Sequence, residues 1–296
     1  MDTVIAFDAF MERIERGGRL TPAEIEDLAG TPDILSLGML ADTLRRRLHG
    51  TRVTFLRVAE LSFDAVSAGG MTAAAREVRL TGTPADLDSA VAAVETVKTV
   101  SGDRTVAGFT WVDVDRWSAG TSAERVLARL KRAGLDAIAE LALDRINDPA
   151  GVVQSLKNAG FERLRLTIGK APAEGRPSLL VRAAELQDAC GVIQSINPLP
   201  MALAAFRPTT GYEDVKMVAL ARLAAPNVPS IQVDWQRYGP KLAQVALTFG
   251  ADDLDGISAS DEAPEGRRRA PRAEIERNVA AAGFSPIERD GRFNAL

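Results

Sequence analysis

Residues that build catalytic and structural centres are scarce in this chain of 296 residues, which has one cysteine, Cys190, and one histidine, His49. A disulfide within the chain is excluded, and so is a zinc site made of cysteine and histidine ligands. A nucleophilic triad would have to use His49, which follows a predicted helix and precedes Gly50, a position more typical of a helix cap. The low thiol content favours a cytoplasmic location.

Long apolar runs and an excess of positive charge are also missing. No run of about 18 apolar residues occurs, so we expect no membrane span. Residues 1–18 carry early acids instead of a basic segment before an apolar one, so no signal peptide is predicted. The 36 basic and 40 acidic residues give a net charge of −4, which offers no general nucleic-acid footprint. Hydrophobic residues at 46% and charged residues at 26% are typical of a globular protein and exclude a disordered chain.

The sequence does contain a repeated unit, a helix that ends at a glycine and is followed by a short apolar run. Arg129–Leu141, Ser155–Leu166 and Gln244–Ile257 all have this pattern. A glycine past a helix end supplies the left-handed conformation that closes the helix, and the runs are long enough for strands. The predicted strands are Arg52–Val58, Glu77–Leu80, Thr105–Trp111, Ala137–Leu141, Arg163–Thr167, Val192–Ile196, Ser230–Val233 and Leu254–Ser258. The predicted helices between them are Asp86–Val100, Ala123–Ala133, Pro149–Asn158, Leu179–Ala189, Tyr212–Leu223 and Pro240–Phe249.

Alternating strands and helices of this kind predict an α/β fold, a parallel (β/α)8 barrel of the TIM type, with a doubly wound open sheet as the alternative. Thr21-Pro22-Ala23-Glu24 has the pattern of a helix start with a capping box. Further helices are predicted over Ile34–Leu48 and Ala273–Ala281. The expected divisions are an N-terminal helical cap (1–50), the barrel (51–260), and a mobile loop with a C-terminal helix that packs on the barrel (261–296).

In such barrels chemistry takes place at the C-terminal ends of the strands, so the residues that follow each predicted strand are candidates. The carboxylates Glu60, Glu140 and Asp234 are candidate catalytic acids or bases. The candidate ligand-binding residues are Arg57, Gly82, Trp111, Thr167, Lys170, Asn197, Trp235 and Gln236. Arg57 and Lys170 could hold a carboxylate or phosphate. For each of these residues the alternative is a solvated rim with local salt bridges.

Two groups of side chains at these ends leave alternatives open. Trp111 and Trp235 could stack on an aromatic ring or could pack the barrel. Three carboxylates without a histidine make a weak site for a hard cation, so no metal site is predicted. Asp252, Asp253 and Asp255 lie around the start of the last predicted strand, on the structural side of the barrel, and are interpreted as turn residues.

Several longer segments follow the pattern of one enzyme family. They are Leu40–Thr54, Ala133–Asp136, Ala184–Ala189, Asn197–Pro200, Pro208–Leu223 (PTTGYEDVKMVALARL), Asn227–Pro229, Ile231–Trp235 and Gly239–Gly256 (GPKLAQVALTFGADDLDG). On these segments the chain resembles the aminofutalosine synthase family of radical S-adenosylmethionine enzymes, which includes dehypoxanthine futalosine cyclases and deazaflavin-cofactor synthase subunits. The resemblance implies a barrel and a role in menaquinone synthesis by the futalosine route or in deazaflavin synthesis.

The resemblance also implies a [4Fe–4S] cluster, held by three cysteines spaced CxxxCxxC after the first strand. The corresponding stretch, Val58–Arg76, has no cysteine and is too short for the family's loop, and Cys190 lies on a distant predicted helix. An iron–sulfur cluster needs thiolate ligands, so we predict no cluster, no cofactor and no radical activity. Gly82 alone carries over from a glycine-rich turn near the nucleoside, Lys170 replaces a histidine, and Met201–Phe206 replaces a polar loop with an apolar one.

Three hypotheses follow for function. In the first, the chain is a non-catalytic paralogue, a pseudoenzyme that acts as partner or regulator of an enzyme of menaquinone synthesis. In the second, it binds a small molecule such as a nucleoside or an aromatic acid. In the third, it is an enzyme with non-radical acid/base chemistry at the barrel mouth. A pathway enzyme or a small molecule is therefore the expected partner, and no nucleic acid or membrane is expected.

Overall fold

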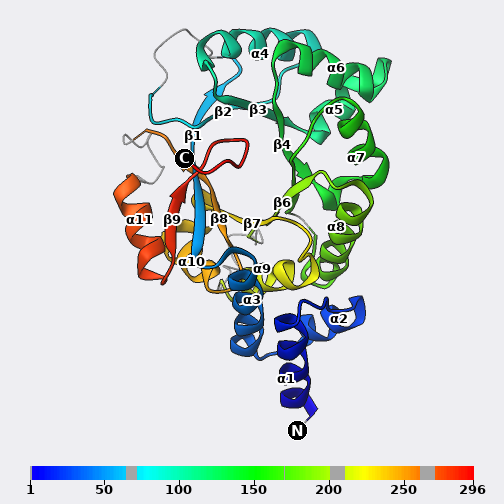
Figure 1. The fold of residues 1–296 in the computed structure, drawn as a ribbon. Coiled ribbons are helices and arrows are strands. Elements are labelled where there is room, and N and C mark those ends of the chain that lie inside the picture. Colours follow the sequence, from blue (N-terminus) through cyan, green and yellow to red (C-terminus); the bar gives the residue numbers. More distant parts are fainter. Residues whose placement is uncertain (1, 65–71, 170, 201–210, 261–270) are drawn as a thin grey trace, which may run out of the picture.

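The chain folds into a closed parallel barrel inside a ring of helices (Figure 1). The computed structural model describes residues 2–64, 72–169, 171–200, 211–260 and 271–296. The barrel strands pair in the order β2-β3-β4-β5-β6-β7-β8-β1, and the pairing of β2 with β1 closes the ring. The strands are β1 (Arg52–Ser62), β2 (Glu77–Thr81), β3 (Thr105–Thr110), β4 (Ala137–Ala142), β5 (Leu164–Ile168), β6 (Ile193–Pro198), β7 (Ser230–Asp234), β8 (Asp253–Ser258) and β9 (Ser285–Glu288). The predicted (β/α)8 barrel is confirmed, and the open sheet is wrong.

The helices follow the strands around the ring. They are α1 (Asp2–Glu15), α2 (Pro22–Gly30), α3 (Ile34–His49), α4 (Leu87–Ser101), α5 (Trp111–Trp117), α6 (Ala123–Ala133), α7 (Pro149–Asn158), α8 (Arg176–Cys190), α9 (Tyr212–Ala224), α10 (Trp235–Leu247) and α11 (Arg272–Ala281). Short 3-10 turns lie at Ser118–Gly120, Leu143–Arg145 and Ala173–Gly175. Within the described part of the chain, no helix has the length and apolar character needed to cross a membrane.

The unit built from α6 and β4 shows why the sequence folds in this way. Ser122 caps the start of α6 by accepting a hydrogen bond from the Arg125 N–H, and Gly134 ends the helix in the left-handed region at φ 109°. Between these ends Val126, Leu127 and Leu130 are buried against the barrel. Burial of each such side chain contributes about 1.5–3 kcal/mol, so the apolar face holds the helix on the sheet.

The N-terminal helices pack on one side of the barrel, around α9 (Figure 1). The capping box is present, since the Thr21 hydroxyl accepts from the Glu24 N–H and Glu24 accepts from the Thr21 N–H. Buried Lys216 of α9 donates to the Thr31 carbonyl at 2.9 Å, which fixes the link between α2 and α3. A Cβ at Gly38 would lie 2.8 Å from the Phe249 ring, so α3 approaches the barrel closely at that point.

The C-terminal segment (residues 285–296) closes the N-terminal end of the barrel. β9 pairs in parallel with the first residues of β1, and the chain then loops across the barrel opening (red in Figure 1). Arg289 is fully buried there and binds Asp253 of β8, while the Gly291 carbonyl accepts from Arg165 of β5 at 2.8 Å. This end of the barrel is therefore filled by the chain itself, and the sequence analysis did not predict β9.

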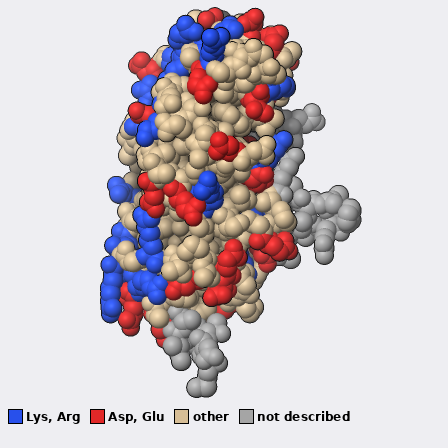
Figure 2. All heavy atoms as spheres, turned by 90° about the vertical axis from the view of Figure 1, so that its right-hand side faces the viewer, with Lys and Arg blue, Asp and Glu red and all other residues tan. Residues whose placement is uncertain are grey.

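The outer face made by α6, α7 and α8 carries both signs of charge among uncharged surface (Figure 2). One of these charges, Arg129 of α6, pairs with Asp88 of the neighbouring helix α4 at 2.7 Å. A mixed pattern of this kind favours a solvated exterior.

Candidate functional site

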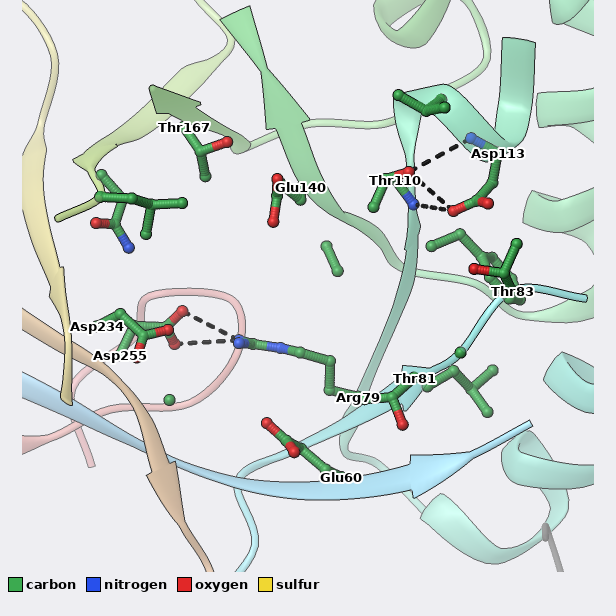
Figure 3. A pocket seen from close by; sticks show the side chains of 18 of the residues that line it. Glu60, Arg79, Thr81, Thr83, Thr110, Asp113, Glu140, Thr167, Asp234 and Asp255 are labelled. Carbon is green, nitrogen blue, oxygen red and sulfur yellow. Dashed lines mark hydrogen bonds and ion pairs between the residues drawn. The ribbon is translucent and has the colours of Figure 1, made fainter. Parts of the chain in front are cut away.

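A cavity of about 900 Å³ opens at the C-terminal end of the barrel. Polar side chains reach it from the ends of most of the strands and from α5 and α10, and Figure 3 labels ten of them. This volume is within the range of small-molecule sites, about 300–1,000 Å³.

The floor of the cavity is built around Arg79 of β2. Its Nη2 donates to Asp255 of β8, the strand on the other side of β1, at 3.1 and 3.2 Å, and to Glu77 at 2.7 Å (Figure 3). Burial alone would raise the pKa of Asp255, but the positive charges of Arg79, Arg165 and Arg289 outweigh burial and hold that pKa well below its ordinary value. Asp255 is therefore an ionised carboxylate at neutral pH, and Arg79 is fully engaged.

Asp234 lies beside Asp255, and its pKa is shifted in the opposite direction. The two residues are register partners on β7 and β8, and Figure 3 shows their side chains together on one wall. Burial raises the pKa of Asp234, and the negative charge of Asp255 raises it further. Asp234 also caps α10 by accepting from the Arg237 N–H at 2.9 Å. Gly256 lets it sit close to β8, because a Cβ there would lie 3.1 Å from Asp234 Oδ2.

Two buried polar atoms on the adjoining wall, which β5 and β6 form beside β7, have no hydrogen-bond partner among the described residues. Thr167 of β5 and Asn197 of β6 are register partners that line the cavity, and they are 7% and 5% exposed. Thr167 Oγ1 and Asn197 Oδ1 accept or donate no hydrogen bond within the described part of the chain. A buried polar atom without a partner costs about 1–3 kcal/mol, which a ligand or water at this wall would recover.

The rim of the cavity carries exposed arginines that follow strands β3, β4 and β7. Arg116 on α5 donates to the Pro84 carbonyl at 2.7 Å, and Arg237 on α10 lies 3.7 Å from Glu140. Arg145, in the 3-10 turn after β4, is exposed and forms no ion pair with the residues that the structure describes. Below the rim, Thr110 starts α5 with a capping box to Asp113, which holds both side chains in place (Figure 3).

Most of the residues predicted from the sequence meet in this cavity. They are Glu60, Gly82, Glu140, Thr167, Asn197, Asp234 and Gln236. Gly82 has φ 89°, and a Cβ there would lie 2.8 Å from the Phe63 ring, so a side chain would be strained. Lys170 and the segment 201–206 lie outside the described residues. The catalytic and binding roles of all these residues stay predictions.

Three predicted ligand-binding residues do not line this cavity, and their binding roles stay predictions. Arg57 is in the middle of β1, because that strand runs on to Ser62, and its guanidinium binds Glu288 of β9 at 2.6 Å. Trp235 is 1% exposed in the core, and Trp111 packs against the core at the start of α5. Both tryptophans therefore fit the packing alternative.

Sequence reasoning missed Arg79 and misjudged two of the aspartates. Asp253 and Asp255 were interpreted as turn residues, but both lie on β8, where Asp253 binds Arg289 and Asp255 binds Arg79. A signal was present, since Glu77 and Arg79 alternate with Val78 and Leu80. Alternate residues of a strand share a face, so this pattern indicates a charged barrel interior.

The residues of this chain do not fit the iron–sulfur cluster that the resemblance implies. A cluster held by three cysteines needs three thiolates, whereas the chain has Cys190 alone. Cys190 ends α8 on the outer ring, where its carbonyl accepts from Lys157 at 2.8 Å. Among the residues that the structure covers, no group of three or more His, Cys, Asp or Glu side chains is arranged to hold a metal ion.

Comparison with known families and sequences finds similarity to two groups of proteins. The family described as the CofH/MqnC C-terminal region matches residues 199–296. The aminodeoxyfutalosine synthase of Thermus thermophilus is 26% identical, over 96% of this chain and 94% of that protein. The 5-amino-6-(D-ribitylamino)uracil–L-tyrosine 4-hydroxyphenyl transferase of Archaeoglobus fulgidus is 28% identical, over 72% of this chain and 71% of that protein.

Solved structures share the same fold. The FeFe-hydrogenase maturase HydG from Carboxydothermus hydrogenoformans matches with a TM-score of 0.68 and 13% identity, over 97% of this chain and 80% of that one. Methylornithine synthase matches with a TM-score of 0.67 and 14% identity, over 94% of this chain and 97% of that one. At these identities the likeness concerns the architecture.

Proposed function

We propose that this chain, whose residues 199–296 match the family described as the CofH/MqnC C-terminal region, binds a small polar metabolite in the cavity without running that family's radical reaction. The observation that carries the proposal is a polar cavity of about 900 Å³ at the barrel mouth of a chain with one cysteine. The orphaned Thr167 Oγ1 and Asn197 Oδ1 support it, since both atoms need a hydrogen-bond partner inside the cavity.

The class of metabolite follows from the relatives. One is named for aminodeoxyfutalosine and the other for a ribitylaminouracil and L-tyrosine. A nucleoside-like or aromatic acid ligand is therefore proposed, with a role linked to menaquinone synthesis by the futalosine route. In that role the chain is a non-catalytic paralogue that acts as partner or regulator of a pathway enzyme.

Binding is tested by thermal unfolding of the purified protein with adenosine, 5-amino-6-(D-ribitylamino)uracil and L-tyrosine at millimolar concentration. A ligand at 100 times its Kd stabilises the folded state by about 2.7 kcal/mol. At least one compound is expected to raise the Tm of the wild type and to act more weakly on Asn197→Leu, which removes the orphaned acceptor. Arg132→Gln, on the exposed face of α6, is the matched control. No shift with any compound would refute binding.

The proposed lack of radical activity is tested by a separate experiment. Anaerobic reconstitution with iron and sulfide is expected to give no [4Fe–4S] absorbance, and incubation with S-adenosylmethionine and dithionite to give no 5′-deoxyadenosine. Formation of both would overturn this part and leave metabolite binding untouched. The regulatory role predicts that the protein changes the turnover of a purified aminodeoxyfutalosine synthase, and unchanged turnover over a range of ratios would contradict it.

One observation favours a second candidate, an enzyme with acid/base chemistry. Asp234 and Asp255 are neighbours whose pKa values are shifted in opposite directions, a pattern typical of carboxylates with separate proton-transfer roles. Asp234 would hold or release the proton, with Glu60 and Glu140 as the other candidates. Proton NMR in D2O would detect deuterium wash-in to a bound metabolite, and exchange that Asp234→Asn abolishes would favour this candidate over simple binding.

A further inference from the structure

Opposite ends of the cavity differ in the chemistry that they present. The floor offers hydrogen-bond acceptors, the carboxylates of Asp234 and Asp255 and the amide oxygen of Asn197. The rim offers the guanidinium groups of Arg116, Arg145 and Arg237, which also line the cavity. Building on the proposed function, we infer that the ligand is two-ended, with an amino group directed to the floor and an anionic group, carboxylate or phosphate, at the rim.

The floor favours a donor because the cation that the described residues place there, Arg79, already has carboxylate partners. Arg79 places both its ion pairs on Glu77 and Asp255, at 2.7 and 3.1 Å. Asp234, which is half-buried, accepts one backbone hydrogen bond, from Arg237 N–H, and faces the charge of Asp255. An ammonium or amide N–H placed here would offset that repulsion by a charge-assisted hydrogen bond. An anion at the same place would add a third negative charge.

The rim favours an anion because its cations are weakly paired. Arg237 is 53% exposed, and its contact with Glu140 at 3.7 Å is too long for a hydrogen bond. Arg116 is 46% exposed and reaches Asp113 at 3.4 Å. Arg145 is exposed without an ion pair to the described residues. Guanidinium groups that converge on one opening bind carboxylate or phosphate by paired N–H donors.

The test uses a matched set of small aromatic probes measured by isothermal titration. They are 4-(aminomethyl)benzoate, which has both ends, benzylamine and benzoate, which have one each, and 4-(aminomethyl)benzylphosphonate, which replaces the carboxylate with a phosphate-like group. The two-ended probes are expected to bind at least about tenfold more tightly than either single-ended probe, the value of one charge-assisted contact. The better of the two anions identifies the group that the rim prefers.

Variants assign each end. Asp234→Asn keeps the cap of α10 and is expected to remove the advantage that the amino group gives over benzoate. Arg145→Gln is expected to weaken both two-ended probes about three- to tenfold and to leave benzylamine unchanged. Arg132→Gln makes the same change of charge on the outer face of α6 and controls for the overall field.

The outcomes separate this inference from the proposed function. If a metabolite from the thermal panel binds while benzoate equals 4-(aminomethyl)benzoate, or while Arg145→Gln equals Arg132→Gln, the two-ended ligand is wrong and binding stands. If a metabolite binds and no probe does, the two-ended ligand is likewise wrong. If neither metabolites nor probes bind, both proposals fall together.

Discussion

At the N-terminal end of the barrel, Arg289 donates to both oxygens of Asp253 at 2.6 and 2.7 Å, and neither side chain is exposed. At the C-terminal end, Asp234 lies beside a second carboxylate, and Thr167 Oγ1 and Asn197 Oδ1 have no hydrogen-bond partner within the described structure. Both ends hold polar and charged side chains, but they differ in how these side chains are paired. Polar groups that are fully paired stabilise the fold, and polar groups left unpaired cost stability that a ligand can recover.

The largest loss of stability is expected from Arg289→Met at the N-terminal end of the barrel. This change leaves the buried carboxylate of Asp253 without its cation, although Gln232 still donates to it at 2.7 Å. Removing one partner of a buried ion pair costs about 3–5 kcal/mol. Urea unfolding should show this loss, whereas Arg292→Met, at a side chain 51% exposed, should stay within about 0.5 kcal/mol of wild type. Equal losses would mean that the buried pair does not hold this end.

Closure by the C-terminal segment is tested by Gly291→Ala. A Cβ at residue 291 would lie 2.6 Å from Thr105 Cβ and 2.7 Å from Glu77 Oε2, so the loop must move. Overpacking of this kind costs about 1–3 kcal/mol. Gly120→Ala is the control, because its Cβ would meet nothing within 4 Å. A thermal scan in which both variants melt with the wild type would show that residue 291 is not seated against β2.

The paired carboxylates at the cavity floor should respond to pH with opposite signs. The pKa of Asp234 is raised on folding, so its contribution to stability is complete below the unfolded pKa of about 3.9 and is lost as pH rises through the folded value. The pKa of Asp255 is lowered, so its contribution is present above about 3.9 and is lost as pH falls through the folded value. Both signs follow from proton linkage.

At pH 7 we therefore expect Asp234→Asn to stabilise the protein by about 1 kcal/mol and Asp255→Asn to destabilise it by about 1–3 kcal/mol. Asparagine keeps the cap of α10, so the first variant isolates the charge. Urea midpoints at several pH values between about 4 and 8 measure both. Two variants that shift stability in the same direction at pH 7 would contradict the electrostatic contrast between these neighbours.

The sequence was a good guide to the barrel because its boundaries are local. Glycines that close helices and short apolar runs placed the strands to within a few residues, as for Ala123–Ala133, whose limits agree with α6. Two elements were missed for physical reasons. The Thr110–Asp113 capping box that starts α5 was absorbed into the preceding predicted strand. β9 is four residues long and contains Pro286, and it exists because β1 offers a free edge, which no local pattern shows.

The site was predicted less completely, because it depends on how far each strand runs and on which charges pair across the barrel. The expectation that residues at strand ends line the cavity holds for Glu140 and Asp234. It does not hold for Arg57, because β1 continues beyond Val58 to Ser62. Arg79 is on β2 and Asp255 is on β8, which are far apart in the sequence. The two side chains meet only because the barrel closes. The sequence indicates each charge, and only the fold indicates which ones are satisfied.

The smallest effects give the most direct comparison of the two ends, because they change one buried hydroxyl at each. Ser195 Oγ lies deep in the barrel and donates to Gln232 Oε1 at 2.6 Å, whereas Thr167 Oγ1, on the neighbouring strand at the cavity wall, has no partner in the described structure. Ser195→Ala should cost about 1 kcal/mol, because it leaves the amide oxygen of Gln232 unpaired, and Thr167→Val should be neutral or stabilise by up to about 0.5 kcal/mol. The effects on affinity for a metabolite that binds should have the reverse order. Thr167→Val should weaken its binding, whereas Ser195→Ala should leave its affinity unchanged. If both substitutions destabilise the free protein equally, Thr167 is already satisfied without a ligand, and the cavity wall has the same structural character as the closed end.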